Sequence, residues 1–436
     1  MSNAAQPWWR QIERYQWTVL LMTWLGFLFD LMDSTLYTMV MGPALGDLLG
    51  RAGTVQNIGW YGGLIFSVFL VGWALGGIVF GVVADYVGRK PTLMLTILVY
   101  ALCTGLAATA GSWWELGAYR FLTGLGVGGE WAAGAALLAE TWPERARAKG
   151  AAILQTSAGM GYFAAAFIYL MVGGYSWRLV FLVGALPAVL VFMIRKSMRE
   201  SERWLEERCE GATVRGCDGA FDGAKVRRFT LAQIFGRDLR RDTIVGSMLA
   251  SVANFGFWGV SAWVPALIQN RIADDPSLAA GVSASSYVSY AIMILTLGSL
   301  PGYAGVAALA DRFGRKPAFL VFFVGGAFAA PLIFLGPWTI GQMLVLLPLL
   351  GFFTLGIYAA FPIYLPELFP TPLRTTGAGF CFNIGRVVSA AGPFLTGLMV
   401  LYTGSFAYAI SALSLVYLLG PVTLIFARET RGQELA

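Results

Sequence analysis

The stretch DYVGRKP, residues 85–91, returns in the second half of the chain as DRFGRKP, residues 311–317. A second motif, E-x-x-P-x-x-x-R-x-x-G, begins at Glu140 and again at Glu367. The first motif repeats after 226 residues and the second after 227. Two independent motifs at nearly one spacing predict a chain built from two copies of the same repeat.

The composition is that of a membrane protein. Of the 436 residues, 57% are hydrophobic and only 12% are charged, whereas soluble domains carry about 25% charged residues. Apolar runs such as 179–194 and 409–426 approach the length that crosses a bilayer. The N-terminal stretch is polar and interfacial, so we expect no cleavable signal.

Twelve apolar segments have helical length. They lie near residues 17–41, 59–84, 91–111, 113–139, 150–173, 177–194, 243–268, 285–309, 317–336, 338–364, 375–401 and 404–427. We therefore expect an all-α polytopic protein with twelve transmembrane helices in two pseudo-symmetric six-helix bundles. The expected N-terminal bundle covers 1–195, a cytoplasmic connector covers 196–242, and the C-terminal bundle covers 243–436.

Positive charge is distributed unevenly between the two sides of this topology. Of 30 Lys and Arg residues, 25 fall in the termini and the loops of one side, three (Arg51, Arg178 and Arg271) fall on the other side, and two lie in spans. This bias predicts that both termini are cytoplasmic. It also accounts for the net charge of +6, so we expect no nucleic-acid partner.

Cysteine and histidine usage argues against metal chemistry. The four cysteines, Cys103, Cys209, Cys217 and Cys381, form no C-x-x-C pair, so we expect reduced thiols and no metal site. Histidine is absent. Proton transfer near neutral pH must therefore use carboxyl groups or other side chains.

GVVADYVGRKP (81–91), with its second-half copy, resembles the signature between helices two and three of the major facilitator superfamily, and the resemblance covers nearly the whole chain. It implies two halves that alternate access around a central site. It also implies a cytoplasmic charge network that holds the halves together when the carrier is open outward. The residues of this gate are Asp85, Arg89, Glu140, Arg147, Asp311, Arg315, Glu367 and Arg374. The alternative is that they only fix topology and solubility.

Five charged residues lie well inside predicted spans, away from the span ends: Asp30, Asp33, Arg120, Glu130 and Arg386. Each costs about 2.5–3.5 kcal/mol in lipid, so they are expected to face the bundle interior. At 1.5 Å per residue, Asp33 lies about 24 Å above the cytoplasmic entry and Arg120 about 10 Å below the outer entry. In a core about 30 Å thick these levels nearly coincide, so an Asp33–Arg120 salt bridge is geometrically possible.

The first-helix aspartates resemble those of proton-coupled transporters. Sugar porters carry an aspartate on helix one and an arginine on helix four, and aromatic-acid symporters carry D-x-x-D, although Leu31 stands here in place of their usual glycine. The resemblance implies that Asp33 or Asp30 carries the coupling proton, with Arg120 as partner. The alternative is a permanent ion pair that only orients helices.

The glycine run GLGVGGEW (124–131) is expected to serve close helix packing rather than nucleotide binding. Its surroundings resemble sialate and metabolite proton symporters. Glu130 is accordingly either a second protonation site or a helix-packing acid near the inner gate.

Arg386 is the leading candidate for substrate binding. It lies about 17 Å deep, near the midplane, and no acid occurs in the second-half spans. A guanidinium offers a carboxylate two parallel hydrogen bonds. The alternative is a structural arginine that bonds backbone carbonyls or reaches Asp30 or Glu130. Further pocket candidates, each equally compatible with ordinary packing, are Asn383, Gln155, Tyr37, Asn254 and Trp258.

Together these features predict a secondary active transporter, not an enzyme, in a bacterial-type inner membrane. We expect proton-coupled uptake of an organic anion (a monocarboxylate, a sialate-like acid or an aromatic acid) by a monomer, with no cofactor beyond the proton. A proton-coupled sugar symporter is the main alternative, and it would leave Arg386 unexplained. A transporter-like nutrient sensor is the alternative from another class. No G-x-x-x-x-G-K-[ST] is present for ATP-driven transport.

Overall fold

The computed structural model describes residues 12–142, 144–200, 233–274, 283–370 and 373–431. Within these ranges, the side chains of residues 82, 85, 86, 131–136, 139, 140, 144–152, 155, 192, 195, 274 and 374–376 are outside the description. All regular secondary structure in the described part of the chain is helical.

The described residues of the first half form seven α-helices and one short 3-10 turn. They are α1 (Arg14–Leu49), η3 (Gly50–Ala52), α2 (Val55–Val87), α3 (Arg89–Ala107), α4 (Trp113–Thr141), α5 (Glu144–Val172), α6 (Trp177–Gly184) and α7 (Ala188–Ser197). The expected span 177–194 is divided between α6 and α7 at Pro187, which is the N-cap residue of α7.

In the second half several predicted spans are likewise made of consecutive helical pieces. The elements are α10 (Arg240–Val260), η4 (Ser261–Trp263), α11 (Val264–Asp274), α12 (Ala284–Arg312), α13 (Arg315–Phe334), α14 (Ile340–Gly356), η6 (Ile357–Ala360), α15 (Phe361–Glu367), α16 (Arg374–Ser389), α17 (Ala391–Thr403), α18 (Phe406–Ser414), η8 (Leu415–Leu418) and α19 (Leu419–Phe426).

The repeated motif marks the same sharp turn in both halves. Gly88 separates α2 from α3 at a φ of 114°, and Gly314 separates α12 from α13 at a φ of 111°. Side chains with a Cβ rarely adopt this backbone conformation, so glycine allows the turn at both places. The repeat seen in the sequence is therefore also a repeat of backbone geometry.

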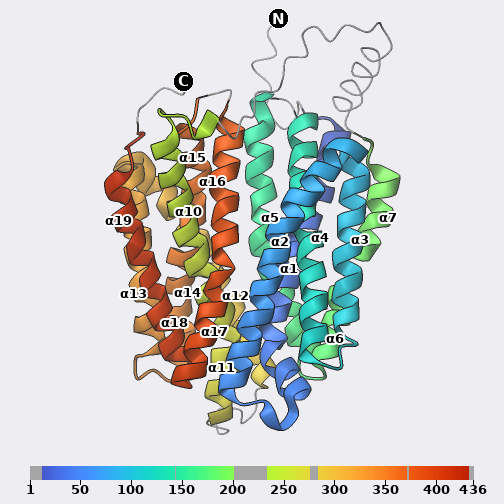
Figure 1. The fold of residues 1–436 in the computed structure, drawn as a ribbon, viewed down its shortest axis with the longest axis vertical. Coiled ribbons are helices and arrows are strands. Elements are labelled where there is room, and N and C mark those ends of the chain that lie inside the picture. Colours follow the sequence, from blue (N-terminus) through green and yellow to red (C-terminus); the bar gives the residue numbers. More distant parts are fainter. Residues whose placement is uncertain (1–11, 143, 201–232, 275–282, 371–372, 432–436) are drawn as a thin grey trace, which may run out of the picture.

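The helices form two groups that lie side by side, with α1–α7 in one and α10–α19 in the other (Figure 1). Within the first group α2 packs on α4, α3 on α4 and α1 on α5; within the second α12 packs on α14 and α10 on α16. Between the groups, α2 packs on α17 and α5 on α12. The sites discussed below lie on these two groups and between them.

The contact between α2 and α17 depends on glycine. Gly59 and Gly63 of α2 face Gly397 of α17, and a Cβ on Gly63 would lie 2.6 Å from the carbonyl oxygen of Pro393. Because no side chain separates the backbones here, the two groups approach each other closely. We refer to Gly59, Gly63 and Gly397 as the glycine seam.

Large apolar side chains cover much of the outer surface, including Ile78, Phe167, Phe328 and Ile425, which are 56–71% exposed. In the part of the chain that the structure describes, nine helical stretches are long and apolar enough to cross a membrane, and two shorter apolar stretches accompany them. Surfaces of this kind are stable in contact with lipid rather than water.

Candidate functional site

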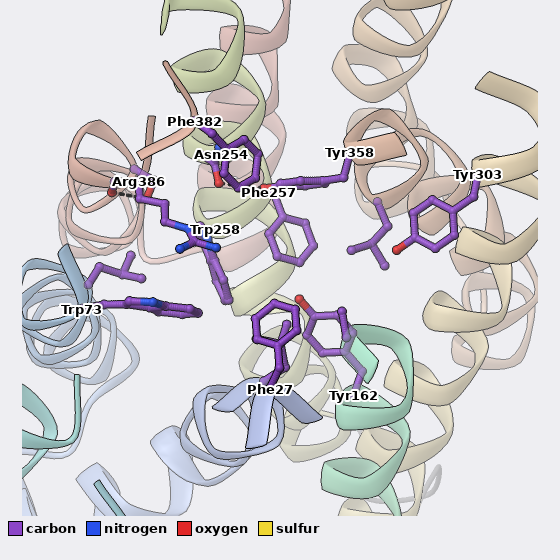
Figure 2. Close-up of a pocket in the computed structure, with 15 residues that line it drawn as sticks. Phe27, Trp73, Tyr162, Asn254, Phe257, Trp258, Tyr303, Tyr358, Phe382 and Arg386 are labelled. Carbon is purple, nitrogen blue, oxygen red and sulfur yellow. Dashed lines mark hydrogen bonds between the residues drawn. The ribbon is translucent and has the colours of Figure 1, made fainter. Parts of the chain in front are cut away.

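A cavity of about 90 Å³ lies between the two groups of helices. Most of its wall is aromatic, as Figure 2 shows. The aromatic residues are Phe27, Trp73 and Tyr162 from the first group and Phe257, Trp258, Tyr303, Tyr358 and Phe382 from the second. The volume is enough for several water molecules, and the wall offers flat surfaces for stacking.

Arg386, on α16, is the cationic residue among those that line the cavity. Its guanidinium carbon lies 5.3 Å from the ring centroid of Trp73 and 5.3 Å from that of Phe382, so the cation is held between two aromatic faces (Figure 2). Cation–π contacts of this kind hold a guanidinium in place while its N–H groups remain directed outward in its plane. The predicted anchor therefore lies in a cavity wall.

Asn254 also lines the cavity, and its amide is already engaged. Its Nδ2 donates to the carbonyl oxygen of Ala250 at 2.8 Å, and its Oδ1 accepts from the hydroxyl of Tyr358 at 3.1 Å. Trp258 completes the wall beside it. Asn254 and Trp258, both predicted pocket residues, therefore line the cavity.

The lining combines one cation with neutral polar groups. Among the described lining residues none carries a carboxylate. Arg386 and the indole nitrogen of Trp73 only donate, whereas the lining hydroxyls can donate or accept. A ligand that brings negative charge therefore matches this lining better than one that brings positive charge.

Other predicted pocket residues lie elsewhere. Asn383 is exposed and does not line the cavity. Tyr37 is fully buried: its hydroxyl donates to the carbonyl oxygen of Gly62 at 3.2 Å, and its ring lies under the guanidinium of Arg120. The side chain of Gln155 is outside the described residues. For Tyr37 the structure favours the packing alternative, whereas the exposed Asn383 supports neither the pocket nor the packing alternative.

Asp33 and Arg120 form the salt bridge that their estimated depths made possible. This contact confirms that the two residues lie at nearly the same depth along their helices. Arg120 Nη2 lies 2.9 Å from Asp33 Oδ2, and Nη1 donates to Oδ1 at 3.2 Å. Thr104 donates a further hydrogen bond to Oδ1 at 2.6 Å. Both charged side chains are completely buried and lie outside the cavity lining. Together, Asp33, Thr104 and Arg120 link α1, α3 and α4.

Asp30 and Glu130 form a second carboxyl site. Both are buried, and their side chains interact with each other. No other described donor bonds to either carboxyl group. The Glu130 carboxyl occupies the space beside Gly26 of α1, where any Cβ would collide with it. Asp30 also interacts electrostatically with Arg386.

The glycine run before Glu130 packs α4 against two neighbours, which confirms the predicted close packing. A Cβ on Gly124 would lie 3.0 Å from the backbone nitrogen of Trp73, and a Cβ on Gly126 would lie 2.7 Å from the carbonyl oxygen of Thr96. Gly128 faces the Trp73 carbonyl oxygen. The run thus fixes both Glu130 and the part of α2 that carries Trp73.

The predicted charge network is visible in the second half. Arg315 binds Glu367 through Nη2 at 2.8 Å and Nε at 3.1 Å, and its Nη1 lies 3.5 Å from Asp311. Arg89 donates to the carbonyl oxygen of Ala84 at 2.9 Å in the first half. These contacts lie within one half each. The side chains of Asp85, Glu140, Arg147 and Arg374 are outside the described residues.

Two glutamates that the sequence analysis missed cap equivalent helices. Glu200 accepts the backbone N–H of Arg89 at 2.9 Å, and Glu429 accepts that of Arg315 at 2.8 Å. Burial raises the pKa of Glu429, but four backbone N–H donors outweigh it and lower that pKa overall. The signal was present, because Arg-Glu-Ser (199–201) and Arg-Glu-Thr (428–430) form a third motif that repeats after 229 residues.

No cluster of three or more potential metal ligands gathers in the described ranges. The cavity is formed jointly by helices of both groups.

The family described as Major Facilitator Superfamily matches residues 23–302, and that described as Sugar (and other) transporter matches residues 224–436. A putative metabolite transport protein of Haemophilus influenzae is 31% identical over 98% of this chain and 99% of its own. The niacin transporter NiaP of Acinetobacter baylyi is 30% identical over 97% and 96%, and the sialic acid transporter NanX of Escherichia coli is 30% identical over 92% and 91%.

Among solved structures, that of a D-xylose-proton symporter superposes with a TM-score of 0.74 at 17% identity, covering 97% of this chain and all of the other. That likeness concerns the fold. Together with the family match, it makes this a multi-pass membrane protein of the bacterial inner-membrane type and a transporter rather than an enzyme. The chain belongs to the Major Facilitator Superfamily.

Proposed function

We propose that the protein takes up an organic anion together with protons by alternating access. In this proposal twelve spanning helices form two six-helix bundles, 1–195 and 243–436, joined by the connector 196–242, with both termini cytoplasmic and the monomer as the working unit. The three repeated motifs and the one-sided distribution of Lys and Arg support this topology.

The observation that carries the substrate class is Arg386 in an aromatic cavity whose described lining holds no carboxylate. A carboxylate would accept from the guanidinium, and an apolar or aromatic body would stack on the walls. A neutral sugar would leave the charge of Arg386 without a counter-charge from the ligand. The names of the relatives, which include transporters of niacin and sialic acid, favour the same class.

Asp30 and Glu130 are the proposed proton site. Two buried carboxyl groups in contact are strongly disfavoured when both are ionised, so one proton between them relieves the repulsion. Asp33 is instead held by Arg120 and Thr104, which suits an ion pair that orients α1 against α4. Of the three carboxylates that the sequence left open, the geometry therefore favours Asp30 and Glu130.

Arg386 would connect the two binding events. Its charge interacts with Asp30 across the space between the groups of helices. An anion bound to Arg386 neutralises that charge, and a proton bound to the carboxyl pair removes the negative charge that would repel the anion. The binding of the anion and of the proton would thus favour each other, which is the thermodynamic requirement for symport.

The test is uptake by the protein reconstituted in liposomes with an inwardly directed proton gradient. Labelled lactate, sialate, hydroxybenzoate, nicotinate and glucose form the panel. We expect at least one acid to accumulate, and accumulation to disappear when the gradient is collapsed. Uptake of glucose alone would contradict the anion assignment. Accumulation that is the same with and without the proton gradient would contradict proton coupling.

A further inference from the structure

Trp73 lines the cavity and carries a buried hydrogen-bond donor that no group in the described residues accepts. Its side chain is 5% exposed, and Nε1 has no hydrogen-bond partner in the described part of the chain. The residue lines the cavity beside Arg386. A buried N–H that lacks an acceptor destabilises the protein, so an acceptor supplied by a ligand would gain more here than at a solvated donor.

The indole has little freedom to find another partner. The backbone of Trp73 is pressed against α4 through Gly124 and Gly128. Its ring packs edge-on against Phe69 at 5.7 Å and against Trp258 at 6.0 Å. The ring is therefore held by its neighbours, and its N–H has a fixed direction relative to the cavity.

The two donors, the Arg386 guanidinium and the Trp73 indole N–H, would contact different parts of a ligand. The guanidinium of Arg386 lies over the face of the Trp73 ring (Figure 2), whereas the indole N–H lies in the plane of that ring. A carboxylate that is bidentate on the guanidinium extends in the guanidinium's own plane. The indole donor is consequently not aligned with the two guanidinium donors, and it would pair with an acceptor other than the carboxylate that Arg386 holds.

We propose that the Trp73 N–H binds a second acceptor of the transported acid, so that the site selects organic acids that carry an acceptor in addition to the anchored carboxylate. A ring nitrogen or a second carboxylate has this chemistry. The inference rests on the proposed function, because it assumes an acid on Arg386. Since Trp73 belongs to α2 and Arg386 to α16, such an acid bridges the two groups of helices.

The test compares ligand affinities of purified variants by calorimetry. Nicotinate and benzoate are a matched pair of similar size and charge that differ in the ring nitrogen, and cis,cis-muconate supplies a second carboxylate. Trp73→Phe keeps an aromatic wall and removes the donor. We expect it to weaken nicotinate or muconate by about tenfold, as the loss of one hydrogen bond implies, and to leave benzoate within about twofold.

Trp263→Phe is the matched control. Trp263 is 1% exposed and its Nε1 also lacks a described partner, but it does not line the cavity. We expect no change in the affinity of any acid. Replacing Trp73 by 3-benzothienylalanine, which keeps the indole shape without its N–H, repeats the test if the phenylalanine variant folds poorly.

Three results would overturn the proposal. They are an equal loss for benzoate and for the acids with a second acceptor, no loss for any acid in either Trp73 variant, and an equal loss in Trp263→Phe. If glucose binds and no acid does, the organic-anion function fails instead. The comparison of Trp73→Phe with Trp263→Phe on glucose then decides whether the indole contacts a ligand at all.

Discussion

Arg386 supplies the positive charge of the cavity, and its guanidinium geometry is what the proposed anchor requires. Arg386→Gln removes the charge and the two parallel donors, so we expect KM for the transported acid to rise by about 10- to 100-fold in liposomes. Arg386→Lys keeps a charge and should recover part of the loss. Arg312→Gln, at an exposed position of α12, is the control. An unchanged KM in Arg386→Gln would remove the residue as the anchor.

The two aspartates of α1 should respond differently to the same amide substitution. Asp30→Asn deletes one member of the carboxyl pair, so proton-driven accumulation should disappear while exchange of labelled for unlabelled acid across the membrane continues. Both activities are measured in the same liposomes. Retained accumulation in Asp30→Asn would contradict the proton role of the pair.

Asp33→Asn should act mainly on stability. It leaves Arg120 buried without its counter-charge, which costs about 3–5 kcal/mol in comparable buried pairs. We expect a large fall in the thermal unfolding temperature, and the double variant Asp33→Asn/Arg120→Leu should recover part of it. If Asp33→Asn keeps full thermal stability and loses only proton coupling, the assignment of the two aspartates is reversed.

At the scale of helices, the carboxylate of Glu429 stabilises the start of α13. Its lowered pKa in the folded protein means that its contribution is present at neutral pH and is lost as pH falls from 4.5 through the lower folded value. Glu429→Gln should therefore lower the unfolding temperature at pH 7, and the difference from the wild type should vanish under acid conditions. A difference that stays constant with pH would show that the charge is not responsible.

The glycine seam should allow α2 and α17 to reach the close contact seen here. Gly397→Val places a side chain against the backbone of Gly59, so the closed contact seen here becomes sterically disfavoured. We expect transport to fall at least about tenfold while the protein remains folded. Gly341→Val is the control, because a Cβ at Gly341 would meet open space. Normal transport by Gly397→Val would exclude a role for the seam in the transport cycle.

How far the sequence predicts these helices depends on the kind of signal. Apolar runs located the described membrane-length helices, because lipid-facing and core helices share that composition. Their ends were less accurate: α1 continues to Leu49, beyond the predicted end at residue 41, and α5 begins at Glu144 rather than at residue 150. The aromatic wall was largely missed, since Phe27 or Tyr358 in an apolar run looks the same whether it faces lipid, core or cavity. Asn383 was a predicted pocket residue, and only the packing of α16 shows that it is exposed and outside the cavity lining. To predict the cap by Glu429, one would need to know that its carboxylate lies at the start of α13 in the folded chain.

For the whole molecule, the proposed orientation places Arg51 outside and Arg312 inside. Both positions are exposed, so cysteines introduced there in a cysteine-free background report their side directly. An impermeant maleimide added to intact cells should label Arg51→Cys at once and Arg312→Cys only after the membrane is opened. The opposite pattern would invert the topology and, with it, the expected direction of uptake.

The paired glutamate caps have a mechanical consequence for the whole transporter. Glu200 follows α7 and ties the end of the first group to the start of α3; Glu429 follows α19 and ties the end of the second group to the start of α13. In each half, the segment that follows the last helix is thus hydrogen-bonded to the start of an earlier helix of the same half. Because these hydrogen bonds hold the end of each half in place, its terminal helix resists unwinding. A force that tilts one half therefore acts on the other half rather than unwinding that helix.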